Sequence, residues 1–154
     1  MSDFSEAQSK QLAIELFNKT WELLDMENRG EDDDEMMLQC AYASCYHWRT
    51  AGIDLNQARG EWMISHVAAV LGMAETSLHH AKRSLKICEH HGFGDFDLAF
   101  AYEAMARAAA ALKDCKSHDK YLALAHAAGE QISKAEDKKV FIDGLEAGPW
   151  FGMR

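Results

Sequence analysis

Proline is almost absent from this 154-residue chain, and its scarcity is the first guide to the fold. The one proline, Pro149, lies near the C-terminus, so the long stretch before it contains no obligatory helix breaker. No segment of useful length alternates apolar and polar residues, and residues 99–112 are rich in alanine, a strong helix former. The sequence therefore predicts an all-α fold and argues against a turn-rich sandwich or barrel.

Basic residues are scarce relative to acidic ones: 16 Lys and Arg against 25 Asp and Glu give a formal net charge of −9. The densest basic stretch, Lys82, Arg83 and Lys86, is too small for a phosphate-binding patch. The same acidity disfavours anionic lipid, and no run of 18 apolar residues exists. We therefore expect neither nucleic acid nor membrane as a partner, whereas basic or neutral partners fit.

Two signatures of secreted proteins are missing as well. The first ten residues are polar and lack the apolar core of a secretory signal. The four cysteines, Cys40, Cys45, Cys88 and Cys115, have neither CxxC spacing nor the density of a disulfide scaffold. We expect four reduced thiols, mostly buried, in a cytoplasmic protein.

Apolar residues recur at helical spacing along the chain, and turn residues divide the pattern into about seven helices. Gly30 is expected to end the first helix, and the aspartates after it suit the N-terminus of the second. Asp95 or Asp97 is expected to cap the fifth. The expected helices cover about residues 4–27, 34–51, 57–72, 74–91, 97–112, 115–131 and 135–145.

A helix–turn–helix unit recurs at an offset of 41 residues. Residues 58–85 align with residues 99–126 without a gap, and small residues fall on small residues. Such positions are expected where two helices approach closely. The aligned pairs are Ile64 with Met105, Ser65 with Ala106, Ala68 with Ala109, Leu71 with Leu112, and Ser84 with Ala125.

This pattern resembles the tetratricopeptide (TPR) family, whose unit is a 34-residue helical hairpin. The family has small residues at its eighth, twentieth and twenty-seventh positions, and Ser65, Ser77 and Ser84 fit them in the first unit. In the second unit Ala106 and Ala125 fit, but His118 takes the twentieth position. The period of 41 also exceeds 34. The resemblance covers residues 58–132, while residues 4–51 match by helix count alone.

The resemblance implies one domain, residues 1–154, of stacked antiparallel hairpins. These would lie at about residues 4–51, 57–91 and 97–131, with a capping helix at about 135–145. It also implies a concave groove lined by the first helix of each hairpin. The groove-facing residues carried over from the family pattern are Arg59, Trp62 and His66 in one unit and Phe100, Glu103 and Arg107 in the next.

The residue types at these six positions suit recognition. Within each trio the spacings of three and four place the side chains on one helix face. Trp and Arg are favoured anchors of interfaces. The alternative is that Trp62 and Phe100 belong to the core and the charged residues form an ordinary ion pair.

The segment Tyr46, His47, Trp48 and Arg49 is a second aromatic and basic cluster. Four consecutive residues span most of the helix circumference, so they cannot all face one site. We expect two of them in the core and two at the surface, with His47 or Trp48 as further candidates for the groove.

Eight histidines raise the question of a metal. The pairs 79–80 and 90–91 lie eleven residues apart, about 16 Å along a helix, whereas the ligands of one ion lie about 2 Å from it. Cys88 and His91 offer two ligands without an evident third. No nucleophile elbow, phosphate loop or HExxH motif is present, and Glu61 with Ser65 forms an ordinary helix-surface pair. We expect no metal, no cofactor and no catalysis.

The sequence therefore predicts a non-catalytic TPR-like binding or scaffold protein that takes a peptide or protein in its concave groove. One alternative is a small-molecule or ion sensor built around Trp48, Trp62 and His66. Another is a homo-oligomer whose groove or stack end is buried in a homodimer. An open groove of peptide width would favour the first function, and a closed, roomy cavity under Trp62 would favour the sensor.

Overall fold

The computed structural model describes residues 4–153, which form seven α-helices and no strand. The predicted all-α fold is confirmed, and every expected helix is present with small shifts at its ends. Within the described residues, no helix combines the length and apolarity needed to cross a membrane. The helices are α1 (Glu6–Asp25), α2 (Glu31–Ala51), α3 (Asp54–Val70), α4 (Ala74–His91), α5 (Asp95–Ala111), α6 (Cys115–Glu130) and α7 (Ala135–Glu146).

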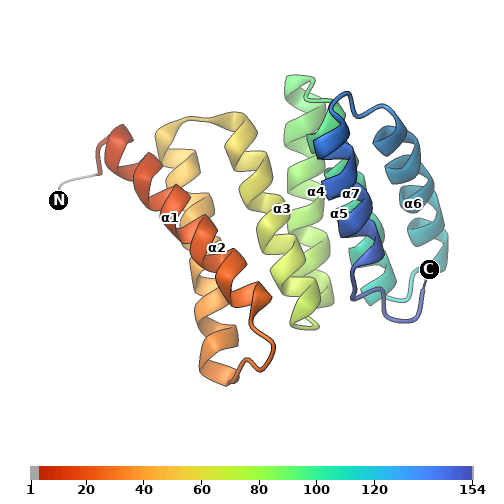
Figure 1. Ribbon diagram of the computed structural model, residues 1–154, viewed down its shortest axis with the longest axis horizontal. Helices are drawn as coiled ribbons and strands as arrows, with labels where there is room; N and C mark the ends of the chain where they lie inside the picture. The colour runs from red at the N-terminus through yellow and green to blue at the C-terminus, as the bar shows by residue number, and fades with distance from the viewer. Residues whose placement is uncertain (1–3, 154) are drawn as a thin grey trace.

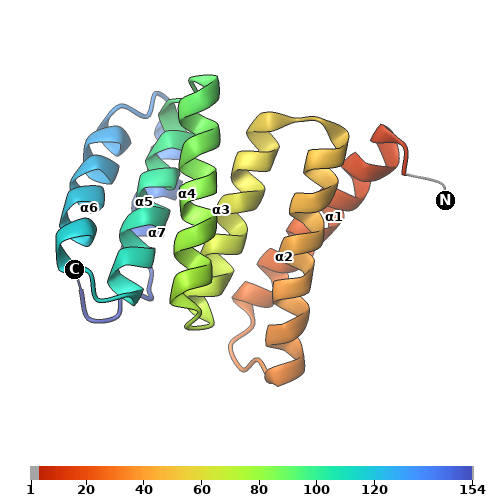
Figure 2. The ribbon, with the colours of Figure 1, turned by 180° about the vertical axis from the view of Figure 1, so that it is seen from behind.

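Consecutive helices lie side by side as antiparallel hairpins, α1 with α2, α3 with α4 and α5 with α6 (Figure 1). Helix α3 also contacts α5, and α5 contacts α7. One face of the stack therefore carries α1, α3, α5 and α7, while α2, α4 and α6 form the opposite face (Figure 2). This arrangement fits stacked helical hairpins.

The small residues of the repeat lie where helices of a hairpin approach closely. Ser65 Oγ donates to the carbonyl of Ser77 at 2.8 Å, and Ser77 Oγ donates to the carbonyl of Ser65 at 2.9 Å. Ser84 Oγ bonds the Ala58 carbonyl in the same way at 2.9 Å. Hydrogen bonds from buried hydroxyls to backbone carbonyls thus join α3 to α4. A longer side chain at these positions would hold the two helices apart.

In the third hairpin alanines replace two of these three serines. Ala106 on α5 and Ala125 on α6 are both fully buried. Ala106 packs in a cluster that includes Trp150, from the segment after α7. The unexpected His118 is also buried and meets Trp150 edge-on, with 5.9 Å between ring centroids. The repeat alignment is therefore in register in both units.

Glycines end two of the helices, but the predicted role of Gly30 is wrong. Gly52 and Gly92 end α2 and α4 in the left-handed region, with φ of 73° and 68°. Gly30 does not end α1; its φ is −87°, and it begins α2. Carbonyls at the end of α1 bond Arg29 instead: its Nη1 donates to those of Leu23 and Leu24 and to that of Met26 just beyond the helix, and its Nε donates to Asp34. An arginine side chain here does what a glycine cap does elsewhere.

Three of the four cysteines are buried, and Cys115 is exposed. All four are free thiols. Burial raises the pKa of Cys45 to about 12, with a further contribution from the nearby Glu61 carboxylate. Burial likewise raises the pKa of Cys88 to about 11. At neutral pH both groups are protonated and pack as small apolar side chains.

Ala106→Leu tests the close packing of the third hairpin. Because Ala106 is fully enclosed by α6 and Trp150, the larger side chain should lower the free energy of unfolding by roughly 1–3 kcal/mol. Urea denaturation followed by circular dichroism measures the effect, and Ala127→Leu on the exposed side of α6 is the matched control. Equal midpoints for the two variants would contradict the packing described here.

Candidate binding cavity between α1 and α7

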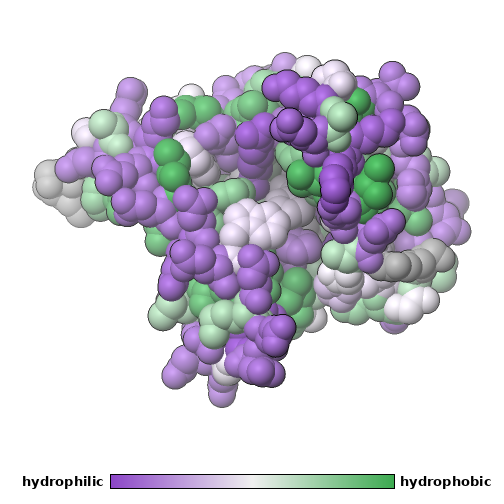
Figure 3. Space-filling view, viewed as in Figure 1, coloured by the Kyte–Doolittle hydropathy of each residue, from purple (hydrophilic) through white to green (hydrophobic). Residues whose placement is uncertain are grey.

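A cavity of about 480 Å³ opens on the face formed by α1, α3, α5 and α7. Figure 3 shows this face hollowed near its centre, with hydrophilic and hydrophobic residues side by side around the hollow. Five of the cavity's fifteen lining residues are phenylalanine or tryptophan. These rings belong to Phe17, Trp21, Trp62, Phe96 and Phe100.

Five of the six residues predicted for the groove line this cavity: Arg59, Trp62, His66, Phe100 and Glu103. Trp62, His66 and Phe100 are half-buried, and the side chain of Arg59 is 46% exposed. Glu103 is buried, with 1% of its surface accessible, and lies in the floor. The predicted convergence of one helix face on a concave surface is therefore observed for these five.

Arg107 departs from the expectation. It is 2% exposed and lies outside the cavity lining, in a buried pair with Glu103. A side chain so enclosed is a structural element behind the cavity wall and presents no surface to a partner.

The rings form a continuous chain from α1 to α5. Trp21 of α1 lies 5.9 Å from Trp62 of α3, and Trp62 meets Phe100 of α5 edge-on at 5.3 Å. Phe17 and Phe96 extend the chain at its two ends, with ring distances of 6.5 and 4.7 Å to their neighbours. Three of these four contacts are edge-on, a favourable ring geometry, so the wall is preformed.

Arg59 and Asp97 form an ion pair at the cavity rim. Arg59 Nε and Nη2 donate to the two carboxylate oxygens at 2.7 and 3.2 Å. The hydrogen bond to Asp97 raises the pKa of Arg59, against the effect of burial. The guanidinium also lies 5.8 Å from the ring centre of Phe96. Asp97 is thus a pairing residue and not the cap of α5, which begins after Gly94.

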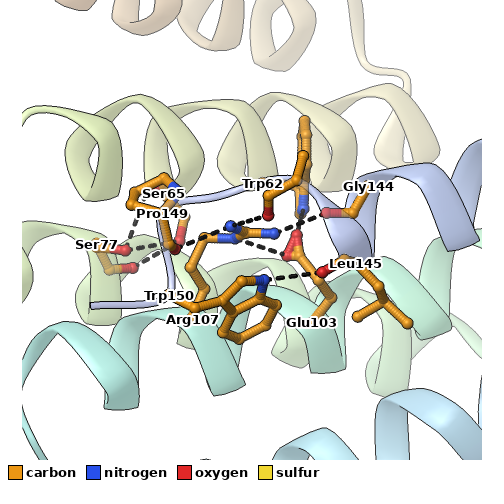
Figure 4. Close-up of polar contacts among 10 residues, drawn as sticks. Trp62, Ser65, Ser77, Glu103, Arg107, Gly144, Leu145, Pro149 and Trp150 are labelled. Carbon is orange, nitrogen blue, oxygen red and sulfur yellow. Dashed lines mark hydrogen bonds and ion pairs between the residues drawn. The ribbon is translucent and has the colours of Figure 1, made fainter. Parts of the chain in front are cut away.

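Glu103 meets two donors, both at long range (Figure 4). Trp62 Nε1 donates to one carboxylate oxygen at 3.3 Å, and Arg107 Nε donates to the other at 3.5 Å. Burial raises the pKa of Glu103, and the positive charge of Arg107 opposes that rise. Charge-assisted hydrogen bonds are normally 2.7–2.9 Å long, so this carboxylate retains unused acceptor capacity.

Arg107 holds the C-terminal segment in place. Its Nη1 donates to the carbonyls of Ala147 and Pro149, each at 3.0 Å, and its Nη2 donates to that of Gly144 at 2.9 Å. The guanidinium lies 4.2 Å from the ring centre of Trp150, whose Nε1 donates to the Leu145 carbonyl at 2.8 Å. Figure 4 shows these groups converging on one guanidinium. The end of α7, which contributes one wall of the cavity, is fixed to α5 by these bonds.

His66 stacks on Trp62, with ring centres 5.0 Å apart and planes inclined by 10°. Its Nδ1 is enclosed and has no hydrogen-bond partner. Burial lowers the pKa of His66 to about 3, and the charge of Arg107 acts in the same direction. The imidazole is therefore neutral at pH 7.

His47 and Trp48 do not reach the cavity. Both are buried, at 8% and 5% exposure, whereas Tyr46 and Arg49 are exposed. The split into two core and two surface residues is as predicted. The ring of His47 lies between those of Phe4 and Tyr46, away from the cavity lining. The prediction that His47 or Trp48 faces the groove is therefore wrong. Their positions on α2 turn both side chains toward the core.

A second polar cluster was missed by the sequence reasoning. Glu61, expected to form a helix-surface pair with Ser65, is buried at 2% exposure, and Ser65 is buried at 1%, as its small-residue position in the repeat predicts. Glu61 pairs with His80 Nδ1 at 2.6 Å and accepts from Arg83 Nε at 2.8 Å, while Tyr42 OH lies 3.0 Å from His80 Nε2. Burial acts to raise the pKa of Glu61, but the bonds from His80 and Arg83 outweigh it and hold the pKa below its usual value. The cluster joins α2, α3 and α4.

No set of three or more His, Cys, Asp or Glu side chains within residues 4–153 is arranged to hold a metal ion. In comparisons with known proteins, no family model, no curated protein and no solved structure matches the chain. The assignment of a function therefore depends on the cavity itself.

Arg107→Met should destabilise the fold by about 3–5 kcal/mol, because it leaves the Glu103 charge buried without its partner and three carbonyls without their donor. Urea denaturation measures the loss. The double variant Arg107→Met, Glu103→Leu should recover part of it, since no buried charge then remains. A single variant as stable as the parent would show that the buried pair contributes little.

His66 predicts a pH dependence of stability. A histidine with a folded pKa of about 3 and an unfolded pKa near 6.5 is protonated first in the unfolded state as the pH falls. The contribution of the neutral imidazole to the free energy of unfolding is intact above pH 6.5 and is lost as the pH falls from 6.5 to 3. Between pH 7 and pH 5 the free energy of unfolding should fall by about 2 kcal/mol. Denaturation midpoints at the two pH values should differ less in His66→Phe. His126→Phe, at an exposed site, is the matched control. If the stability of His66→Phe depends on pH as steeply as that of the unsubstituted protein, His66 is not the source of the pH dependence.

Proposed function

We propose that this chain is a non-catalytic TPR-like binding protein that takes a segment of a peptide or protein partner on its concave face. The observation that carries the proposal is the preformed aromatic cavity between α1 and α7, lined by five of the six residues that the repeat pattern predicted. Hot spots of interfaces are enriched in tryptophan and lie in well-packed pockets. Trp62, half-buried at the centre of the ring chain, fits that description.

The rims of the cavity support a larger partner. Trp21 on α1 is 38% exposed, and Val140 on α7 is 53% exposed. Both line the cavity from opposite sides. A partner that inserts one side chain would therefore find apolar surface on both flanks, which is how a peptide segment adds contact area around its anchor.

A small molecule is the second candidate occupant, and the cavity volume favours it. About 480 Å³ lies within the range of roughly 300–1,000 Å³ usual for small-ligand sites, which are mostly apolar with a few placed polar groups. Helix α7 contacts α5 and adds Val140, Asp143 and Gly144 to the lining. A free ligand could thus fill the space that a partner side chain would occupy.

The proposal places the protein in the cytoplasm, without nucleic acid or lipid as a partner. The formal charge of −9 supports the exclusion of polyanions. Free thiols, three of them buried, suit a reducing compartment. A homodimer formed through the concave face remains an alternative use of the same surface.

Trp62→Ala tests the proposal. Saturation-transfer NMR with a library of acetylated decapeptides and of metabolite-sized molecules identifies binders to the parent protein. For a binder seated in the cavity, the variant should weaken affinity by roughly 2 kcal/mol, about thirtyfold. Tyr46→Ala, at a 61% exposed aromatic on α2, is the matched control and should leave affinity unchanged.

Circular dichroism separates a binding effect from a folding effect in these variants. Phe96→Ala, at the edge of the ring chain, provides a second test if Trp62→Ala loses helicity. Binders that respond to Tyr46→Ala and ignore both cavity variants would place the binding surface outside the cavity.

A further inference from the structure

The charges around the cavity disfavour an anion as its ligand. Its lining carries one arginine against three carboxylates, Asp97, Glu103 and Asp143, and no lysine. The arginine, Arg59, is already bonded to both oxygens of Asp97. Asp143 accepts from the exposed Lys139 at 2.7 Å, and Glu103 pairs with the buried Arg107. Each of the three carboxylates is thus paired with one cation, and the one cation in the lining is already bonded, so an anion would find no available positive charge there.

The floor offers an acceptor that the protein itself uses poorly. A carboxylate can accept about four hydrogen bonds, and Glu103 receives two, at 3.3 and 3.5 Å. Since Glu103 is buried and lines the cavity, a donor or a positive charge entering from the cavity would stabilise it.

The aromatic walls add attraction for the same kind of group. The faces of Trp, Tyr and Phe rings attract cations, and several rings around one space form cages for substituted ammonium groups. This wall already holds one cation, because the Arg59 guanidinium lies 5.8 Å from the centre of the Phe96 ring. Trp21 and Trp62, the strongest ring type for this interaction, lie 5.9 Å apart in the centre of the chain.

We propose that the occupant of this cavity is an organic ammonium group, held against the cavity-facing sides of Trp21 and Trp62 with the Glu103 carboxylate beside it. The inference rests on the proposed binding function and specifies the ligand chemistry. Such a group can come from a free small cation or from a lysine-type side chain of a partner, and the same cavity would recognise either.

A pair of probes that differ in charge alone tests the inference. Choline and its neutral isostere 3,3-dimethyl-1-butanol have nearly the same shape. Isothermal titration should show choline binding about tenfold or more tightly than the isostere, because the neutral molecule gains neither the ring attraction nor that of the carboxylates. The indole N–H signals of Trp21 and Trp62 in ¹⁵N NMR spectra should shift with choline.

Two carboxylate variants locate the effect. Glu103→Gln should reduce the preference for choline over the isostere at least severalfold. Asp143→Asn, at the rim, should also reduce the preference for choline over the isostere, but by less than Glu103→Gln. This variant keeps the test valid if Glu103→Gln fails to fold. Glu35→Gln, an exposed carboxylate on the far face of α2, is the control and should change nothing.

A further pair of probes separates the two sources of the ammonium group. A decapeptide carrying one trimethyllysine should bind more tightly than choline if the partner is a peptide, and no more tightly if it is a free cation. Equal affinity for choline and the isostere would overturn the ammonium inference and leave the cavity as an apolar binding site. Absence of choline binding, with neutral members of the library still bound, would do the same. If nothing in the library binds, the proposed function fails along with it.

Discussion

A guanidinium buried in the third hairpin holds the cavity of this protein together. An unpaired charge away from water costs several kcal/mol, so a buried arginine requires that its donors be satisfied. Arg107 satisfies them with the Glu103 carboxylate and with three carbonyls at the end of α7 and just beyond it. The position of α7 follows from those bonds. Because α7 forms one wall of the cavity, the geometry of the cavity depends on a residue that does not line it.

The architecture could be predicted from the sequence because its determinants are local. Helix periodicity and glycine stops lie within each element, and the small residues of the repeat mark each hairpin contact. Ser65 and Ser77, twelve residues apart, bond each other's backbone as their positions in the repeat imply. The face that carries Arg59, Trp62 and His66 was likewise readable from spacings of three and four, since neighbours on one turn share a direction.

The buried contacts of the charged residues could not be predicted from the sequence, because they join distant parts of the chain. Spacing places Glu103 and Arg107 on one face of α5 but does not say what covers that face. The covering carbonyls lie 37 to 42 residues further along the chain. Glu61 was misread for a similar reason, because its partner His80 comes from the next helix, 19 residues away. In each case the spacing of residues along one helix does not reveal the distant partner that buries the polar side chain.

The distance between Arg107 and its acceptors has a consequence for synthesis. A chain emerging from the ribosome completes its N-terminal parts first, and stacked hairpins can fold by adding one unit to the last. The second hairpin can find polar partners within its own two helices, such as Ser77 for Ser65, twelve residues away. Helix α5 cannot: until residues 144–149 have emerged, Arg107 has Glu103 but none of these carbonyls. The polar contacts of α5 are thereby completed only when the C-terminal segment arrives, so a nascent chain interrupted before that point leaves Arg107 without three of its acceptors.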